Sequence, residues 1–218
     1  MIAFSEKRAQ TPLIVEAYRG GVFPMPLRTG FHALGWWSPM RRGVLPLDSF
    51  RVTRSMRQAT KRYLTTIDCD FVGVVNGCAH PRRPFGWIDH SIKEAYVELH
   101  RAGLAHSVET WDSAGRLVGG LYGVSLGGLF CGESMFHHPE YGRDASKVAL
   151  MRLIDALSSD ECADMRVIDV QWPTPHLTSM GAITIERDEY LALLDELMDI
   201  PEINWDSQRI PTEAPRRD

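Results

Sequence analysis

The sequence predicts an α+β fold, in which a small N-terminal α/β domain (residues 1–50) precedes a larger domain with a mixed sheet (residues 51–218). Three observations support this prediction. The first fifty residues are rich in Gly, Pro and aromatic residues, a composition that favours turns and short strands. Residues 105–136 read as successive strands separated by glycine-containing turns. Third, segments in which apolar residues have helical spacing lie before and after one β-branched strand.

The composition is that of an ordinary globular protein. With 218 residues and 44% hydrophobic residues, the chain can bury a sizeable core. It has no 18-residue apolar run and its first residues lack signal-peptide features, so we expect a cytoplasmic, monomeric protein without membrane contact. The net charge of −4 argues against a surface coated by nucleic acid, although it allows a local basic patch.

The larger domain begins with a basic segment, RVTRSMRQATKRYL, from Arg51. Helical spacing after Ser55, a plausible N-cap, places its cations on one side of a short helix. These cations are Arg54, Arg57, Lys61 and Arg62. Such a face, with Arg41 and Arg42 nearby in the sequence, could follow an RNA backbone, and a merely solvated helix face is the alternative.

A helix is predicted for residues 91–102, with Asp89 near its start and Gly103 just after its end. The strand AHSVETW, the turn at residues 113–115, the strand LVGGLYGV, the turn at residues 126–128 and the strand LFCGESMF follow. This order predicts an antiparallel meander.

After the meander, residues 146–157 are apolar nearly all round and predict a buried helix. MRVIDVQW then reads as a strand and DEYLALLDELM as an amphipathic helix. The polar tail from about residue 205 is expected to be poorly ordered. The order meander, helix, strand is that of the core of the GNAT acyltransferase fold.

Glu133 lies between Gly132 and Ser134 in the second glycine-rich strand. A partly enclosed carboxylate there could accept from an ammonium group or fix a cationic substrate group. The alternative is a structural ion pair with Lys147 or Arg143.

Asp169 and Gln171 lie two residues apart in the strand VIDVQ, so strand geometry places both side chains on the same face. A carboxylate in an interior strand is costly unless it is hydrogen-bonded, and a neighbouring amide or a substrate amine would meet that need. The alternative is an edge strand with a solvated face.

Aromatic residues near these positions could form an apolar pocket or a stacking surface, with core packing as the alternative. They are Trp36, Trp37, Trp87 and Phe130. Neither a metal nor another cofactor is expected: His137 and His138 are adjacent and would point to opposite faces of a strand, and the cysteines form no CxxC pair.

Ordered blocks from about Val15 to Leu194 resemble the leucyl/phenylalanyl-tRNA–protein transferases. They include AYRGGVFPM, WWSPMRRGVL, FRVTRSMR, GWID, EAYVELHRAGLAHSVETW, LVGGLYG, FCGESMF and IDVQ. The resemblance implies a GNAT-like C-terminal domain and an aminoacyltransferase that moves Leu or Phe, with Met as a minor donor, from aminoacyl-tRNA. The acceptors would be proteins with N-terminal Arg or Lys, and the product an N-degron for Clp-dependent proteolysis.

The same resemblance implies a role for each block. The catalytic and acceptor-binding residues would be Glu133, Asp169 and Gln171. The aminoacyl-adenosine pocket would include Trp37, Trp87, Phe130 and Leu121. The basic segment would contact the tRNA.

Three departures from the family pattern flank the presumed acceptor site: Asp144 where Asn is common, HHPEY after ESMF, and WPTP after Gln171. Two other functions compete with aminoacyl transfer. An acetyl-CoA-dependent N-acetyltransferase would share the fold, but the turn GRDASK lacks the successive glycines of a pyrophosphate loop. The function of a non-catalytic RNA-binding module would not explain Glu133, Asp169 and Gln171.

Overall fold

The computed structural model describes residues 3–5, 11–26, 34–80 and 88–209. Its main element is a seven-stranded sheet in which one neighbouring pair, β8 and β9, is parallel and the other pairs are antiparallel. In spatial order the strands are β10 (Ile183–Glu186), β4 (Arg41–Pro46), β9 (Val167–Gln171), β8 (Leu129–His137), β7 (Leu117–Leu126), β6 (Ala105–Trp111) and β5 (Leu64–Ile67). The predicted α+β class with a mixed sheet is confirmed.

Strands β6, β7 and β8 form the predicted antiparallel meander. Gly115 and Gly127, in the two connecting turns, have φ values of 73° and 59°, a left-handed conformation that glycine adopts without a steric penalty. Helix α5 (Ala145–Leu157) then crosses back so that β9 runs parallel to β8. The predicted order of meander, buried helix and strand is therefore confirmed.

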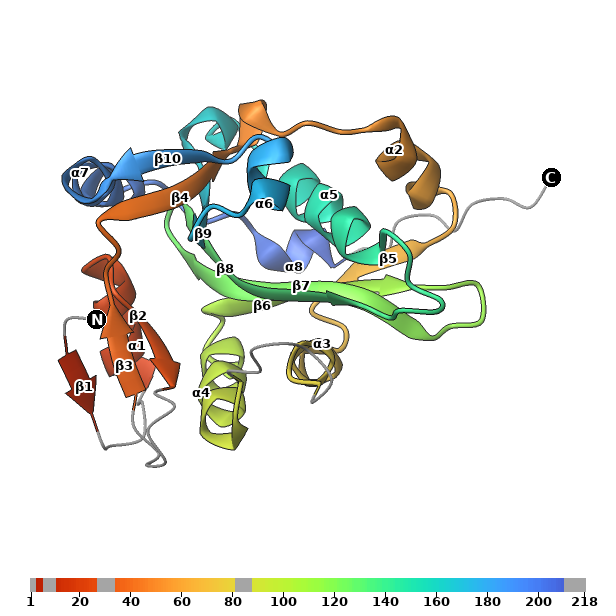
Figure 1. Cartoon of the computed structure of the whole chain (residues 1–218), viewed down its shortest axis with the longest axis horizontal. Helices are drawn as coiled ribbons and strands as arrows, with labels where there is room; N and C mark the ends of the chain where they lie inside the picture. Colours follow the sequence, from red (N-terminus) through yellow and green to blue (C-terminus); the bar gives the residue numbers. More distant parts are fainter. Residues whose placement is uncertain (1–2, 6–10, 27–33, 81–87, 210–218) are drawn as a thin grey trace.

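Helices cover both faces of the sheet (Figure 1). In that view α3 (Phe71–Cys78) and α4 (His90–Arg101) lie below it, and α5 and α6 (Pro175–Ser179) lie above it. Each face has its own hydrophobic core. Phe71 and Leu99 belong to the core below, and Phe130 and Leu153 belong to the core above.

Side chains that accept hydrogen bonds from backbone amides fix where two helices begin. Asp89 caps α4, because its Oδ1 accepts from the Ile92 amide at 2.9 Å. Helix α2 (Arg54–Thr60) is capped by Thr53. The predicted cap at Ser55 is wrong: Ser55 already lies in the first helical turn, whereas the extended Thr53 offers its Oγ1 to the Met56 amide.

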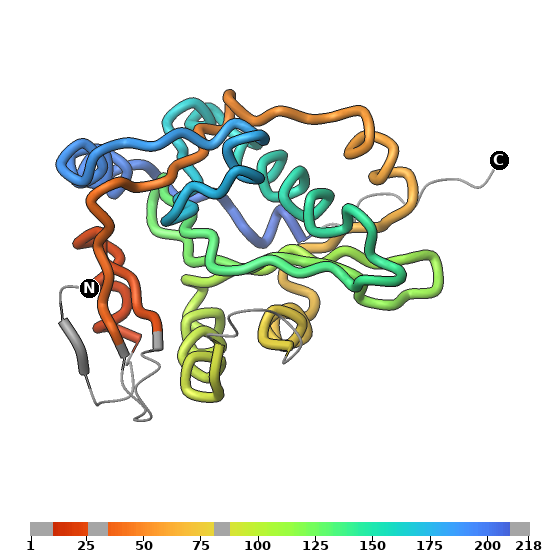
Figure 2. The backbone as a smooth tube through the Cα atoms, in the orientation of Figure 1, coloured from red at the N-terminus to blue at the C-terminus, as the bar shows by residue number. Residues whose placement is uncertain are grey.

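The N-terminal lobe consists of a three-stranded antiparallel sheet and helix α1 (Thr11–Arg19). The strand order is β1 (Ala3–Ser5), β3 (Leu34–Trp37), β2 (Phe23–Pro26). After β3 the chain enters the large sheet directly as β4, which Figure 2 shows as a continuous path. The large sheet thus takes its first strand from within residues 1–50.

The C-terminal part adds helix α7 (Arg187–Met198) and helix α8 (Trp205–Gln208). Trp205 is buried against His106, with 4.0 Å between the ring centres. Fixed structure therefore continues to residue 209, beyond the expected start of a poorly ordered tail, while residues 210–218 lie outside the described part. Among the described helices, none has the length and apolar character needed to cross a membrane.

Candidate active site

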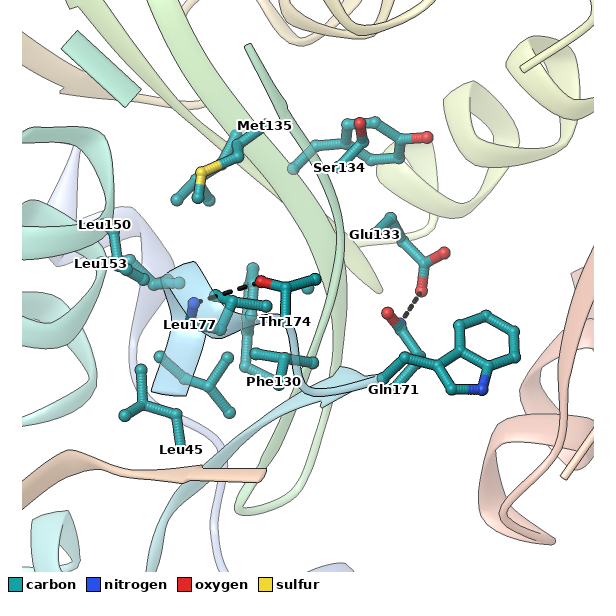
Figure 3. Close-up of a pocket in the computed structure, with 16 residues that line it drawn as sticks. Leu45, Phe130, Glu133, Ser134, Met135, Leu150, Leu153, Gln171, Thr174 and Leu177 are labelled. Carbon is teal, nitrogen blue, oxygen red and sulfur yellow. Dashed lines mark hydrogen bonds between the residues drawn. The ribbon is translucent and has the colours of Figure 1, made fainter. Parts of the chain in front are cut away.

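Glu133 occupies a β-bulge on β8. Tyr122 of β7 is opposite Ser134, and the next residue, Gly123, is opposite Gly132, so Glu133 is the extra residue without a partner on β7. Bulges of this kind change the direction of a side chain and are common beside active sites. Here the bulge accompanies a carboxylate that faces Gln171 from the neighbouring strand (Figure 3).

Two buried phenols hold the Glu133 carboxylate. Tyr18 of α1 donates to Oε1 at 2.6 Å and Tyr96 of α4 donates to Oε2 at 2.8 Å. The two phenol oxygens lie 2.7 Å apart. The alternative of an ion pair with Lys147 or Arg143 is wrong, because both cations face Asp144 instead, at 2.7 Å for Lys147 and 3.9 Å for Arg143.

This environment raises the pKa of Glu133 to about 7. Burial is the largest cause and the negative charge of Asp169 adds to it, whereas the two tyrosine hydrogen bonds and Arg42 act in the opposite direction. A carboxyl group with this pKa exists in both protonation states near neutral pH. It can therefore take up and release a proton there.

Asp169 is fully buried in β9, which lies between β4 and β8, so the alternative of an edge strand is wrong. Arg42 binds its carboxylate in a bidentate manner, with Nε at 2.9 Å and Nη2 at 2.6 Å. The Tyr190 hydroxyl donates to Asp169 at 2.9 Å, and the backbone amide of Gln171 donates to it at 2.8 Å. Because these donors occupy the Asp169 carboxylate, its contribution to the site is to hold the backbone of Gln171 in place.

Gln171 adopts an unusual backbone conformation at the end of β9. Its φ is 55°, and the Trp172 amide donates to the Val170 carbonyl at 2.7 Å, which closes a γ-turn of a rare, strained kind. Val170 is an extra residue opposite the Gly43/Val44 step of β4. The regular alternation from Asp169 to Gln171 is thus interrupted, and the Gln171 Nε2 lies 3.5 Å from Glu133 Oε1.

Gly43 makes room for this turn. A Cβ at this position would lie 2.8 Å from the Pro173 backbone nitrogen and 3.0 Å from a methyl group of Val170. Few side-chain carbons approach other atoms so closely. Glycine at this position therefore lets the segment that follows Gln171 fold tightly against β4.

An apolar cavity of about 280 Å³ extends from the Glu133–Gln171 contact into the core beside α5 (Figure 3). Its wall includes Leu45, Leu121, Phe130, Met135, Leu150, Leu153, Ile168, Val170 and Leu177. Polar lining residues include Glu133, Ser134, Gln171 and Thr174, and Figure 3 shows Glu133 and Gln171 facing each other at one side of the cavity. The cavity far exceeds the roughly 30 Å³ that one water occupies, so it can hold an apolar side chain.

A second cavity of about 180 Å³ lies beside the first and shares Glu133, Gln171 and Trp172 with it. Among the described residues, Phe23 and Met25 of β2 complete its lining. The carboxylate and the amide therefore stand between a larger apolar space and a smaller space walled by the N-terminal lobe.

The structure brings most of the predicted site residues together. Phe130 and Leu121 line the larger cavity with Glu133 and Gln171. Trp37 contacts the region through Trp172, with 6.3 Å between ring centres, and is not among the residues that line either cavity. Trp87 lies outside the described residues.

Three further residues belong to the site. No role was predicted for Tyr18 or Tyr96, and Arg42 was considered only as a cation close to the basic segment that could follow RNA. Tyr18, Tyr96 and Arg42 lie in AYRGGVFPM, EAYVELH and WWSPMRRGVL, blocks that carried the family resemblance. Each is at most 1% exposed and hydrogen-bonds a predicted site carboxylate. The available signal was only that these residues lie within the blocks that resemble the family.

The four cations predicted to contact RNA are exposed on α2 and just after it, away from the cavity lining. Met56 and Ala59 form the buried side of this helix. Arg62 also donates to the Arg143 carbonyl at 3.1 Å. The basic face is therefore a surface feature distinct from the cavity.

The start of α5 is poorly suited to bind a pyrophosphate. Asp144, at its N-cap, has a φ of 65°, a conformation that Asn and Asp tolerate better than most residues. Its carboxylate accepts from Lys147 and lies 4.0 Å from Arg62. An anion placed here would meet this negative charge, which argues against an acetyl-CoA-dependent enzyme.

The comparisons with known proteins agree over most of the chain. The family model described as leucyl/phenylalanyl-tRNA protein transferase matches residues 44–195. The model for the N-terminal domain of the same family matches residues 9–40. The N-terminal match ends at Met40, just before β4, and the other match begins at Val44, within β4, close to where the chain passes from the small sheet to the large one.

Curated relatives carry the same description. A leucyl/phenylalanyl-tRNA–protein transferase of Rhizorhabdus wittichii is 46% identical over 87% of this chain and 75% of its own length. One from Ruegeria sp. (strain TM1040) is 46% identical over 87% of both chains. Among solved structures, that of L-PGS from Bacillus licheniformis matches with a TM-score of 0.43 and 9% identity, over 63% of this chain and 48% of that chain.

Proposed function

The chain belongs to the leucyl/phenylalanyl-tRNA protein transferase family, and on that premise we propose which groups it transfers, to which acceptors, and with which residues. The donor is Leu or Phe, with Met as a minor one, carried by tRNA. The acceptor is the α-amino group of a protein that begins with Arg or Lys. The observation that carries the proposal is the apolar cavity that ends at Glu133 and Gln171.

The larger cavity suits the donor side chain. Its aliphatic and aromatic wall would bury an unbranched or γ-branched apolar side chain, a gain of about 1.5–3 kcal/mol relative to exposure. Charged side chains would lose their hydration there without a partner. Because one methylene changes affinity only modestly, Leu, Phe and Met would compete, with their rates set by fit.

Glu133 and Gln171 stand where the ester carbonyl of such a donor would lie. In the reaction, the lone pair of the acceptor amine attacks this carbonyl carbon and forms the new C–N bond. The C–O bond to the ribose then breaks, and the ribose oxygen takes up a proton. With a pKa of about 7, Glu133 can accept the proton of the amine and return it to the leaving oxygen.

Gln171 contributes orientation rather than proton transfer, because a neutral amide is a poor base. Its side-chain amide lies beside Glu133 and can hydrogen-bond the amine or the developing oxyanion. Asp169 is a positioning residue in this scheme: it fixes the Gln171 backbone from its buried ion pair with Arg42.

The basic face of α2 would contact the tRNA. Arg54, Arg57 and Lys61 recur at helical spacing on the exposed side, where they can neutralise phosphates. Charged tRNA as donor places the reaction in the cytoplasm. The product, with a new N-terminal Leu or Phe, would serve as an N-degron for Clp-dependent proteolysis.

The test is transfer of labelled Leu, Phe or Met from charged tRNA to peptides that begin with Lys, Arg, Asp or Ala, with acetyl-CoA offered in parallel. We expect transfer from tRNA to the Lys and Arg peptides. Gln171→Ala should abolish most of it, whereas Gln208→Ala, in α8, should not. Acetylation without aminoacyl transfer would refute the proposal, and equal transfer to Asp would refute the acceptor assignment.

A further inference from the structure

We propose that a third cavity, on the other side of helix α5, binds a free apolar α-amino acid. This cavity of about 270 Å³ is walled by α5, by β5 and by the end of α2, which lie together at the β5 edge of the large sheet (Figure 1). Its described lining residues are Thr60, Tyr63, Thr65, Val148, Met151, Arg152 and Asp155. It shares none of these residues with the two cavities beside Glu133.

Helix α5 separates the third cavity from the larger cavity beside Glu133. Its four residues in the third cavity, beginning with Val148, recur at positions i, i+3, i+4 and i+7, which form one stripe along a helix. Leu150 and Leu153 line the larger cavity. With 3.6 residues per turn, these two leucines lie on the opposite side of the helix from that stripe. One helix is therefore a shared wall of both cavities.

Arg152 and Asp155 bring opposite charges to the third cavity without forming an ion pair with each other. The Arg152 guanidinium donates instead through Nη2 to the Gln208 carbonyl at 2.7 Å, and its buried Nε has no acceptor among the described residues. Partial burial lowers the pKa of Arg152 and raises the pKa of Asp155. Each charged form is thus incompletely compensated, and a ligand that carries both charges would compensate the two together.

This pair of charges selects a zwitterion. A phosphate would be repelled by Asp155, and a polyamine would be repelled by Arg152. In a free α-amino acid, the carboxylate can accept from the guanidinium while the ammonium group donates to Asp155. The two residues are three apart in α5, so their side chains are neighbours on the helix surface and can reach the two groups of one small molecule.

The remaining lining residues suit an apolar side chain. Val148, which is 3% exposed, and Met151 provide an aliphatic wall. The Tyr63 hydroxyl donates to the Arg143 carbonyl at 2.9 Å, which holds its ring in place as another wall. The volume of about 270 Å³ is close to the 280 Å³ of the larger cavity. Free Leu, Met and Phe are therefore the amino acids that we expect to bind.

An amino acid bound in the third cavity should also act on transfer, because it contacts the helix that forms part of the larger cavity. Coupled sites typically change each other's affinity at least fivefold, so free leucine should change the KM for Leu-tRNA by roughly that factor. This coupling rests on the proposed function, whereas the binding itself does not.

Calorimetry with leucine, leucinamide and 4-methylpentanoate tests the binding. Leucinamide lacks the carboxylate and 4-methylpentanoate lacks the ammonium group, so each loses a hydrogen bond between charged groups and should bind roughly tenfold more weakly than leucine. Asp155→Asn should remove the advantage of leucine over 4-methylpentanoate, and Arg152→Gln should remove its advantage over leucinamide. Asp195→Asn, exposed on α7, should remove neither.

Crystals soaked with free selenomethionine locate the ligand, because selenium scatters anomalously. Selenium should lie between α2, β5 and α5. The inference fails if selenium is found only beside Glu133, if leucine and its two analogues bind equally, or if none of them binds. Binding of guanosine in preference to leucine would likewise overturn it, because the cavity would then recognise a nucleobase.

Transfer from Leu-tRNA to a Lys peptide is measured with and without free leucine. Asp155→Asn should keep the basal rate and lose the effect of leucine. If the unaltered enzyme transfers nothing, the proposed function fails and the binding data still decide the site. If free leucine has no effect, or acts equally on Asp155→Asn through the larger cavity, the coupling across α5 is refuted.

Discussion

Removing both partners of the buried Arg42–Asp169 pair should destabilise the protein far less than the sum of the two single removals. Arg42→Met leaves a carboxylate in a fully buried position, and Asp169→Leu leaves a guanidinium that is 1% exposed. Each single change should lower the free energy of unfolding by about 3–5 kcal/mol, the cost of breaking a buried pair from one side.

The double variant Arg42→Met/Asp169→Leu should lose well under the sum of the two single losses, because a buried ion pair can often be replaced by apolar residues at little cost. Some loss will remain. The Tyr190 hydroxyl and the Gln171 amide both donate to Asp169 and would each lose an acceptor, at about 1–3 kcal/mol per group. We therefore expect the double variant to remain a few kcal/mol less stable than the unaltered protein.

Urea unfolding of the four proteins measures the coupling free energy directly. Additive losses in the double variant would refute the reasoning, because they would mean that the two charges do not compensate each other. Transfer activity provides a second readout. The double variant should stay nearly inactive despite its limited loss of stability, since Asp169 no longer holds the Gln171 γ-turn, and full activity would refute the positioning role.

Three further predictions concern the site and its approach. Transfer by the unaltered enzyme should rise with pH through about 7 as Glu133 loses its proton, and again near 7.7–8.0 as the acceptor amine does; a pH–rate profile of Glu133→Gln should keep only the second rise. Leu153→Phe should fill part of the larger cavity and lower transfer of Phe relative to Leu by roughly tenfold, with equal losses contradicting the donor assignment. Arg57→Glu should raise the KM for aminoacyl-tRNA and reduce its salt dependence, whereas Arg101→Glu, exposed at the end of α4, should change neither; an equal effect would place the RNA elsewhere.

The sequence was most informative where neighbouring residues determine the structure. Alternating residues and glycine turns predicted the meander, and Asp89 and Gly103 marked the ends of α4. Helices α1 and α3 were not predicted. In α3, Gly73 and Gly77 obscure the helical pattern, and the cap, Asp70, looks like one more loop residue.

The site depended on long-range contacts that a single sequence does not display. Glu133 and Gln171 were identified, but their bulge and γ-turn arise from pairing with strands elsewhere in the chain. Arg42 lies 127 residues from Asp169. Likewise, Leu45 and Leu150 line the larger cavity from distant elements and look like ordinary core residues in the sequence.

The position of β4 limits how this protein can be divided. Arg41–Pro46 is the strand that joins β10 to β9, yet it comes directly after the small sheet in the chain. A fragment that starts at residue 51 would lack that strand, and with it Arg42, Gly43 and the partner of β10. Exchange of the N-terminal lobe between relatives should therefore succeed only when the junction lies between Trp37 and Arg41, so that β4 stays with the sheet it completes.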